Sequence, residues 1–521
     1  MIEKNQKIYA SLFIVSSLLF LISFLSLQPL LFSYIDFYGI IFKMDWFFWI
    51  GYVILFILVY FQLTNFDKLD EKYVYLTLLM VVIYLIGTPA FFEHLPRFED
   101  TWSHSFLSQE MFENKKVVNN ISNYEQYPGA FLFFGFLFQL IPSFYVMKFF
   151  PPFLYVLGAI VIYVIFKRLF NGKISFLSSI LYIFFNWTVE DNHISPQFLM
   201  LYIYFLFILV MVKFLSEKRE KMKFFIITSL FSLVIIFSHP GTPIFLLLII
   251  WSMFVLCKKF RNLLLPISTF LLIAFIIYHL YQMTVLESYI TMIKQFFEIL
   301  LTGTGFSRAS TRFYTTILSR RIFITSRIGI TIFSFILGLP GLILSYRKGY
   351  KLGTKFFFAW SFSMTFFFIF ESFVSMGGFH ERFVLISCLP LAALSAYFLI
   401  ETRSSLTILI ILLIISPVYF IAKYGNEAFE SESVEKLKAD CFYNLFDSNC
   451  EKRQEIVDSQ LYPEIYEHFA IRDFTTDREG LMSASIYLEK SVGDIKNIID
   501  GFSSNLRLDR IYSSNNAGTY R

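Results

Sequence analysis

Charged residues are scarce in this chain of 521 residues. Asp, Glu, Lys and Arg make up 16% of it, against roughly 25% in ordinary soluble domains. Cysteine is also scarce, with four residues in the whole chain. These shortages exclude a soluble enzyme, a nucleic-acid-binding protein, a disordered chain and a secreted domain held together by disulfides.

Apolar residues take the place of the missing charge. They account for 56% of the chain, and 69 residues are Phe. Because backbone in lipid must satisfy its own hydrogen bonds, long apolar runs predict membrane-spanning helices. We predict a polytopic all-α membrane protein with about 13 transmembrane helices and a Phe-rich, lipid-facing scaffold. The predicted spans are 8–28, 46–64, 73–91, 145–166, 174–189, 197–213, 224–238, 244–257, 263–283, 322–345, 355–374, 383–400 and 405–422.

The distribution of Lys and Arg predicts the orientation. Basic residues outnumber acidic ones in alternate loops, such as 167–168, 213–223 and 347–355, whereas the remaining loops and the tail lack this excess. Basic loops stay on the cytoplasmic side. We therefore expect a multi-pass protein of the cell membrane, with a cytoplasmic N-terminus and an extracytoplasmic C-terminal domain. No small-residue cleavage site follows the first span, which favours a retained anchor.

Residues 128–142 are apolar enough to span the membrane, but a full crossing would invert every later loop. We expect this segment to lie in the outer interface or to dip in and return, with Pro142 ending it. Whether it fully spans is left open by the sequence.

The chain divides into three parts. Residues 1–72 hold two additional N-terminal helices, residues 73–422 form the main membrane module with external loops 92–127 and 284–321, and residues 423–521 form a small α+β domain. The end of this tail, 506–520, predicts a hairpin with an Asn/Gly turn. Cys441 and Cys450 either close a disulfide outside the membrane or remain two thiols.

Residues capable of chemistry collect in the loops assigned to the outside. Five of the seven His lie there, as do two acidic pairs, whereas the inner loops carry neither a Gly-rich phosphate loop nor an Asp-x-Asp motif. We therefore expect an external active site, where an activated substrate would arrive attached to lipid.

The first large outer loop carries the candidate base. Asp100, beside Glu99, follows a span closely and could take a proton from an acceptor hydroxyl. His104 is one helical turn further on, so Asp100 and His104 could instead share a divalent ion. Alternatively, Glu99 and Asp100 are solvated charges of the loop or cap a helix.

The short outer loop 190–196 is interpreted as a second wall of the same site, because ionisable groups at membrane level are costly. Its candidates for substrate binding are Asp191 and His193, followed by Gln197. The alternative is a turn whose Asp and Asn cap the helix beginning near Pro196. Tyr127 and His239 are further substrate-binding candidates from neighbouring outer segments.

A group of external Arg residues points to an anionic partner. The loop 284–321 and the start of the next helix carry Arg308, Arg312, Arg320, Arg321 and Arg327. His380, Glu381 and Arg382 open the span at 383–400. Guanidinium groups bind phosphate through paired hydrogen bonds, and Arg382 is the best candidate. Attraction to lipid headgroups and snorkelling are the alternatives.

Several motifs, taken in the order in which they occur along the chain, resemble those of the GT-C superfamily of membrane glycosyltransferases. This superfamily includes protein O-mannosyltransferases and lipid A aminoarabinose transferases. The resemblance covers about residues 73–400. Its motifs are Glu99-Asp100, Tyr127-Pro128, Lys148 with Pro151, the span ending Lys167-Arg168-Leu169-Phe170, and the turn through Asp191 and Pro196-Gln197.

This resemblance implies an inverting transferase of the cell envelope that uses a polyprenyl-phosphate-linked sugar, with Asp100 as the catalytic base and Arg and Lys stabilising the departing phosphate. The implied partners are that donor, a lipid, glycan or protein acceptor, and membrane lipids, with no nucleic acid. No cofactor is required, although a divalent metal is left open. The sequence lacks Trp-Trp-Asp-Tyr-Gly, so transfer to Asn is not expected.

Two other functions remain open. A lipid-linked saccharide flippase is the first, although no internal repeat is found and the polar groups gather at one surface. A polysaccharide polymerase or ligase that uses external Arg and His is the second.

Overall fold

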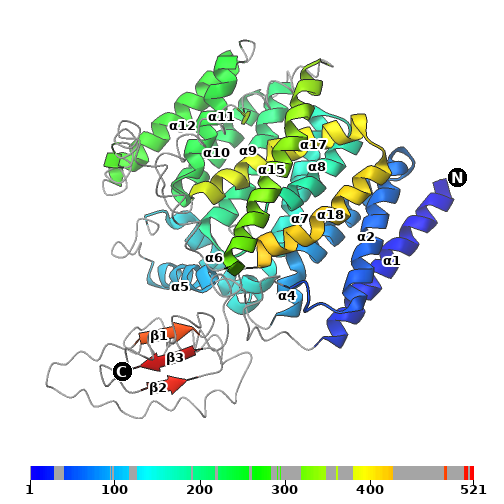
Figure 1. The fold of residues 1–521 in the computed structure, drawn as a ribbon. Coiled ribbons are helices and arrows are strands. Elements are labelled where there is room, and N and C mark those ends of the chain that lie inside the picture. The colour runs from blue at the N-terminus through cyan, green and yellow to red at the C-terminus, as the bar shows by residue number, and fades with distance from the viewer. Residues whose placement is uncertain are drawn as a thin grey trace.

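The structure is a computed structural model. It describes residues 2–27, 40–93, 96, 99–115, 126–188, 192–216, 221–256, 258, 261–282, 290–291, 294, 318–347, 360–361, 379–425, 486–489, 510–513 and 517–520. Most of these residues form a bundle of helices (Figure 1). The helices are α1 (Ile2–Ser26), α2 (Trp46–Thr64), α3 (Glu71–Val82), α4 (Thr88–Phe92), α5 (Glu99–Asn114), α6 (Pro128–Leu140), α7 (Ser143–Leu169), α8 (Gly172–Phe185), α9 (Pro196–Ser216), α10 (Lys221–Ser238), α11 (Thr242–Leu256), α12 (Arg261–Tyr281), α15 (Leu318–Arg347), α17 (Phe379–Thr402) and α18 (Ser405–Tyr424).

The predicted polytopic all-α architecture is confirmed. Among the described residues, nine helices are long and apolar enough to cross a membrane, and α3 reaches this length by continuing through a π-helical turn, Ile83–Gly87, into α4. Three shorter apolar helices fall on the predicted spans at 174–189, 244–257 and 383–400. The predicted span at 355–374 lies almost entirely outside the described residues.

The segment at 128–142 forms the short helix α6. Its 13 residues reach about 20 Å at 1.5 Å per residue, which is less than the roughly 30 Å of a bilayer core. The helix ends before Ile141, whose backbone is extended, and Pro142 then precedes α7. This helix alone is too short to cross, and Pro142 separates it from the next span as predicted.

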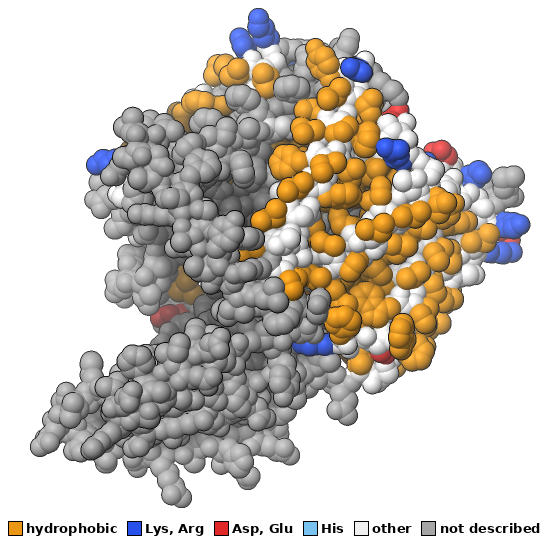
Figure 2. Space-filling model, in the orientation of Figure 1, with side chains coloured by type: hydrophobic (Ala, Val, Ile, Leu, Met, Phe, Trp, Pro, Cys, Tyr) orange, Lys and Arg blue, Asp and Glu red, His pale blue; other side chains and the backbone are white. Residues whose placement is uncertain are grey.

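Large apolar side chains cover the described part of the molecular surface. Figure 2 shows a broad hydrophobic area on one face of the bundle, and exposed residues such as Leu25, Ile336 and Ile414 contribute to the apolar surface. In water such an area would drive aggregation, whereas a bilayer covers it. The chain is therefore a multi-pass membrane protein, and the direction in which it crosses stays a prediction.

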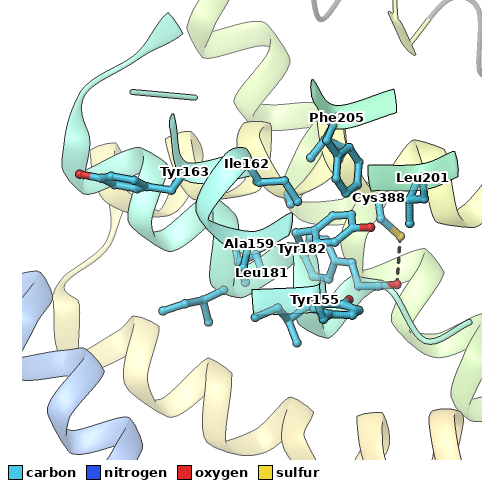
Figure 3. Packing of buried hydrophobic residues seen from close by; sticks show 14 of the residues in the cluster. Tyr155, Ala159, Ile162, Tyr163, Leu181, Tyr182, Leu201, Phe205 and Cys388 are labelled. Carbon is cyan, nitrogen blue, oxygen red and sulfur yellow. Dashed lines mark hydrogen bonds between the residues drawn. The ribbon is translucent and has the colours of Figure 1, made fainter. Parts of the chain in front are cut away.

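Aromatic residues also fill the interior, which corrects the expectation that the Phe residues form a mainly lipid-facing scaffold. Phe56, Phe184 and Phe205 are fully buried. In the close-up of Figure 3, Tyr182 packs between Tyr155 and Phe205, and the thiol of Cys388 donates to the Phe185 carbonyl oxygen at 3.0 Å. Rings provide packing area between helices, where the hydrophobic effect gives no driving force in lipid.

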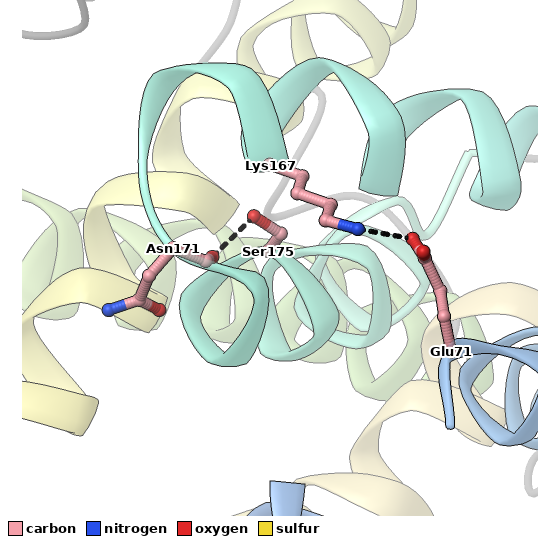
Figure 4. Close-up of polar contacts among 4 residues, drawn as sticks. All are labelled: Glu71, Lys167, Asn171 and Ser175. Atoms are coloured by element: carbon pink, nitrogen blue, oxygen red, sulfur yellow. Dashed lines mark hydrogen bonds and ion pairs between the residues drawn. The ribbon is translucent and has the colours of Figure 1, made fainter. Parts of the chain in front are cut away.

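One end of the bundle is held by an ion pair between α3 and α7. Lys167 Nζ lies 2.7 Å from Glu71 Oε1 (Figure 4). Next to it, Asn171 caps α8 by accepting from the Ile174 N–H, and Ser175 donates to the Asn171 carbonyl oxygen. We call this the Glu71 end. It carries Lys167, one of the basic residues assigned to the cytoplasmic side.

The two N-terminal helices pack against both early and late parts of the chain. Tyr84 of the π-helical turn donates to the Ser16 carbonyl oxygen of α1, and Tyr52 of α2 donates to Ser416 of α18 at 2.6 Å. The residues predicted to be additional, 1–72, therefore contact the main module through buried polar contacts.

The described part of the tail is a three-stranded antiparallel sheet. Strands β1 (Ile486–Glu489), β2 (Arg510–Ser513) and β3 (Ala517–Tyr520) are arranged in the order β1-β3-β2. Ser513 pairs with Gly518, so β2 and β3 form the predicted terminal hairpin. Cys441 and Cys450 lie outside the described residues, and the disulfide stays a prediction.

Candidate functional site

The structure brings together the two outer loops that were predicted to share a site. His104 of α5 lies beside His193, which precedes α9; their ring centroids are 6.3 Å apart and the rings are nearly parallel, at 12°. His104 also lies 5.8 Å from the ring of Phe131 in α6. We call this the α5 end of the bundle.

The acidic pair lies in the first turn of the same helix. Glu99 and Asp100 are the first two residues of α5, so Asp100 precedes His104 by about one turn. The side chains of both acidic residues lie outside the described part, as does all of Asp191. The roles predicted for these three carboxylates therefore stay predictions.

The loop between α8 and α9, residues 186–195, is buried where it is described. His193 is 3% exposed and Asn192 8%. Ser195 caps α9 by accepting from the Phe198 N–H at 3.1 Å, whereas the Asn192 amide donates to Tyr424 at 3.4 Å. The alternative in which Asn192 caps the helix is therefore wrong, because its side chain is directed to α18.

Two buried polar atoms near this loop lack a hydrogen-bond partner among the described residues. They are Gln197 Oε1, on α9, and Ser105 Oγ, on α5 next to His104. Leaving a buried donor or acceptor unsatisfied costs about 1–3 kcal/mol. Such atoms are suited to bind hydroxyl groups of a bound molecule or water.

Tyr127 joins the beginning of α6 to α12. Its buried hydroxyl lies 2.9 Å from His279 Nε2, and His279 Nδ1 lies 2.8 Å from the Phe275 carbonyl oxygen. Because a carbonyl oxygen only accepts, Nδ1 carries the proton and Nε2 accepts from Tyr127. Tyr278 adds a second link by donating to the Gln126 carbonyl oxygen. Tyr127 thus has a structural contact, and its predicted part in substrate binding stays a prediction.

His239 lies at the junction of α10 and α11. The side chain is buried, and its Nδ1 accepts from the backbone N–H groups of Gly241 and Thr242 at 3.2 and 3.1 Å. His239 therefore shapes the beginning of α11 through its Nδ1 atom.

Most side chains of the predicted arginine site lie outside the part of the chain that the structure describes. Arg308 and Arg312 are outside the described residues, and the side chains of His380, Glu381 and Arg382, at the beginning of α17, are not described. Their role in phosphate binding stays a prediction.

Sequence reasoning missed two buried charged residues near the same end. Lys423, in the last turn of α18, is 0% exposed and donates to the Thr188 carbonyl oxygen at 2.8 Å. Glu93, which follows α4, is 2% exposed and interacts electrostatically with Lys148 of α7. A lysine at the supposedly outer end of the last span, against the positive-inside trend, was the signal that could have identified Lys423.

No cluster of three or more His, Cys, Asp or Glu occurs among the residues that the structure describes. His104 and His193 provide two imidazoles, which are ligands that many transition metals accept. The carboxylates that would complete a set are not described, so the metal site at Asp100 and His104 stays a prediction.

No family model and no curated protein matches the chain. Among solved structures, the chain is similar to the oligosaccharyltransferase of Archaeoglobus fulgidus crystallised with Zn and sulfate, at 15% identity and a TM-score of 0.48, over 75% of this chain and 57% of that one. A second structure from Archaeoglobus fulgidus, the oligosaccharyltransferase AglB in complex with an inhibitory peptide and a dolichol-phosphate, gives 13% identity and a TM-score of 0.46, over 75% of this chain and 60% of that one.

A third similar structure is ArnT from Cupriavidus metallidurans bound to undecaprenyl phosphate, at 10% identity and a TM-score of 0.48, over 90% of this chain and 98% of that one. The chain spans about three fifths of the length of the archaeal enzyme. Because these TM-scores are below 0.5, the functional proposal rests on the residues of this chain.

Proposed function

We propose that this protein is an inverting membrane glycosyltransferase of the GT-C type. It moves a sugar from a polyprenyl-phosphate-linked donor to an acceptor hydroxyl at the α5 end of the bundle. The observation that supports this most is the meeting of His104 and His193 at 6.3 Å. This contact brings α5, which begins with the acidic pair Glu99 and Asp100, next to the loop that precedes α9. That loop was predicted to be the second wall of the site.

The location suits a substrate that is part lipid. A polyprenyl chain remains in the bilayer while its phosphate and sugar lie at the membrane surface. Tyr52 and Tyr204 illustrate the aromatic interior of the described part of the bundle, where burying a charged phosphate would be costly. Polar groups at the α5 end can receive the sugar without drawing it into the membrane.

The proposed reaction needs a base and a charge-stabilising cation. The Asp100 carboxylate takes the proton of the acceptor hydroxyl as the hydroxyl oxygen attacks the anomeric carbon. The bond from that carbon to the phosphate oxygen breaks, and its electron pair leaves with the lipid phosphate. Attack opposite the leaving group inverts the anomeric configuration. Arg382, supported by Arg308 and Arg312, stabilises the departing phosphate.

We assign the binding of the donor sugar to the polar groups that the structure describes at the α5 end. His104 and His193 lie side by side, one from each wall, and the Gln197 amide offers an oxygen that has no hydrogen-bond partner among the described residues. Together they provide donors and acceptors for sugar hydroxyls. Binding of the donor sugar beside these groups would keep it near the beginning of α5, so that Asp100 can act on the acceptor.

The experiment is transfer of label from a panel of polyprenyl-phosphate sugars in membranes that contain the protein. We expect Asp100→Asn to lower the rate at least about 100-fold, since a base at the reacting proton contributes 10²–10⁴-fold. The matched control is Glu110→Gln, on the same helix and partly exposed, with an expected rate near that of the unmodified chain. Retained transfer in Asp100→Asn would remove Asp100 as the base.

A further inference from the structure

The α8–α9 loop is a buried loop, and its backbone needs hydrogen-bond partners from elsewhere. Asn186 and Thr188 are fully buried. The Asn186 amide donates to the hydroxyls of Tyr155 and Tyr182, at 3.3 and 3.1 Å, and Thr188 donates to the Asn186 side chain at 2.8 Å. These contacts satisfy side chains, whereas the carbonyl oxygens beyond the end of α8 require separate donors.

Lys423 supplies those donors from the far end of the sequence. Its ammonium donates to the carbonyl oxygens of Asn186 and Thr188, at 3.3 and 2.8 Å, and lies 5.8 Å from the centroid of the Tyr155 ring. A cation at this position also interacts favourably with the C-terminal dipole of α8. One buried side chain of α18 thus fixes both residues at the start of the loop.

The next residue of α18 fixes the other part of the loop. Tyr424 donates to the Leu85 carbonyl oxygen at 2.8 Å and accepts from the Asn192 amide at 3.4 Å. Asn192 directly precedes His193. Lys423 and Tyr424 therefore hold the loop on both sides of its undescribed residues, 189–191.

Arg327 of α15 connects this support to a third helix. Its Nε donates to the Ala422 carbonyl oxygen at 2.9 Å, and its guanidinium lies 4.6 Å from the ring centroid of Trp187. Trp187 in turn donates to Thr331 of α15 at 2.9 Å. Arg327 is 7% exposed, so it acts within the fold, between the last turn of α18 and the loop.

We infer that Lys423 is a positioning residue for the transfer reaction. It holds the α8–α9 loop so that His193 faces His104 across the site, and Tyr424 and Arg327 support it. This inference rests on the proposed function for its effect on activity. The effect on the position of His193 does not depend on that function.

The kinetic test uses Lys423→Met and Tyr424→Phe. For Lys423→Met we expect kcat to fall between about 10- and 100-fold with KM for the donor nearly unchanged, because small displacements of reacting groups have effects of this size. Tyr424→Phe keeps the ring and should lower kcat less, in the same direction. Lys167→Met, which breaks the ion pair at the Glu71 end, is the matched control and should keep kcat.

A double-mutant cycle separates positioning from general damage to the fold. If Lys423 acts through His193, then Lys423→Met should lower kcat little further in a His193→Ala background, because the positioned group is already absent. Fully multiplicative losses in the double variant would overturn the inference.

A second measurement needs no activity. His104→Cys and His193→Cys are introduced into a chain whose four native Cys are replaced by Ser, and the copper-phenanthroline cross-link yield is measured with and without Lys423→Met. We expect the yield to fall severalfold in the Lys423→Met chain. An unchanged yield would overturn the inference, whereas a wild-type chain that transfers no sugar, with the yield still falling, would contradict only the proposed function.

Discussion

At the scale of single residues, polar side chains join helices that lie far apart in the sequence. Tyr52 reaches Ser416, Tyr127 reaches His279, and Lys423 reaches Thr188. In lipid the hydrophobic effect does not hold helices together, so packing and interhelical hydrogen bonds take on that role. Each such contact fixes which two helices are neighbours, and the apolar pattern of the sequence alone does not determine this.

Asp45 lies outside the predicted spans, and its polar contacts allow a prediction of how stability depends on pH. The carboxylate caps α2 by accepting from the Phe48 N–H at 2.9 Å and from Ser26 at 2.7 Å. Burial alone would raise the pKa of Asp45, but hydrogen bonds from Ser26 and from the backbone outweigh it and hold the pKa below its ordinary value. The ionised form is therefore the stabilising one.

A carboxylate with a lowered pKa stabilises the fold above its unfolded pKa, and this contribution is lost as the pH falls through the folded pKa. We expect Asp45→Ala to cost about 1 kcal/mol near neutral pH, and the difference from the unmodified chain to shrink as the pH is lowered below the ordinary pKa of an Asp side chain. Thermal unfolding of the purified protein in detergent measures this. A difference that grows on acidification would contradict the assignment, and Asp45→Asn should keep most of the cap.

At the scale of elements, α15 lies directly against α17 at two glycines. Gly338 and Gly341 allow this approach, because a Cβ at Gly338 would lie 2.9 Å from the Leu391 side chain and one at Gly341 would collide with the Leu394 carbonyl oxygen. Small residues at such crossings are typical of membrane helices. The backbone of α17 cannot move aside as a side chain would.

We expect Gly341→Ala to destabilise the protein by about 1–3 kcal/mol, as overpacking does in a well-packed interior. Gly329→Ala is the control on the same helix, since a Cβ there meets nothing within 4 Å. That change should be neutral or stabilise by up to about 1 kcal/mol through helix propensity. Equal melting temperatures for the two variants would show that α15 and α17 are not in close contact.

Much of the element order was predictable because it depends on local pattern. Apolar length and charge predicted most of the spans, and Pro142 predicted the break between the short helix at 128–140 and the next one. The turn residues near 514–518 predicted the terminal hairpin. The π-helical turn at Ile83–Gly87 was not predictable, since no local signal in the sequence separates it from an ordinary helix.

The candidate site was predictable only in part. The sequence placed His104 and His193 in two loops of one surface, and the structure brings their rings together. The support from Lys423 and Tyr424 was missed, because a contact between residues more than 230 positions apart is tertiary and leaves no periodic pattern. The interior role of many Phe residues was missed because apolar runs do not tell which face meets lipid.

At the scale of the whole molecule, the two ends of the bundle should lie on opposite sides of the membrane. The α5 end carries the candidate site, and the Glu71 end carries Lys167 with Glu71. The positive-inside rule assigns the Glu71 end to the cytoplasm. An external site requires this orientation.

Impermeant maleimide labelling of intact cells tests the orientation, using single-cysteine variants of a chain without its native Cys. We expect Glu113→Cys, at the exposed end of α5, to react from outside, and Lys68→Cys, near the Glu71 end, to react only after permeabilisation. The reverse pattern would refute the external site, while labelling of both positions before permeabilisation would indicate leaky cells and require repetition with sealed ones.

The central claim is that the protein transfers a sugar rather than moving its lipid carrier. The most direct measurement places the purified chain in proteoliposomes with polyprenyl-phosphate sugars labelled in the sugar, together with a membrane fraction as the source of acceptors. We predict that label leaves the lipid and appears in an acceptor with inverted anomeric configuration, and that Asp100→Asn abolishes this transfer. Label that crosses the bilayer while remaining on its polyprenyl phosphate would contradict the claim and favour a flippase.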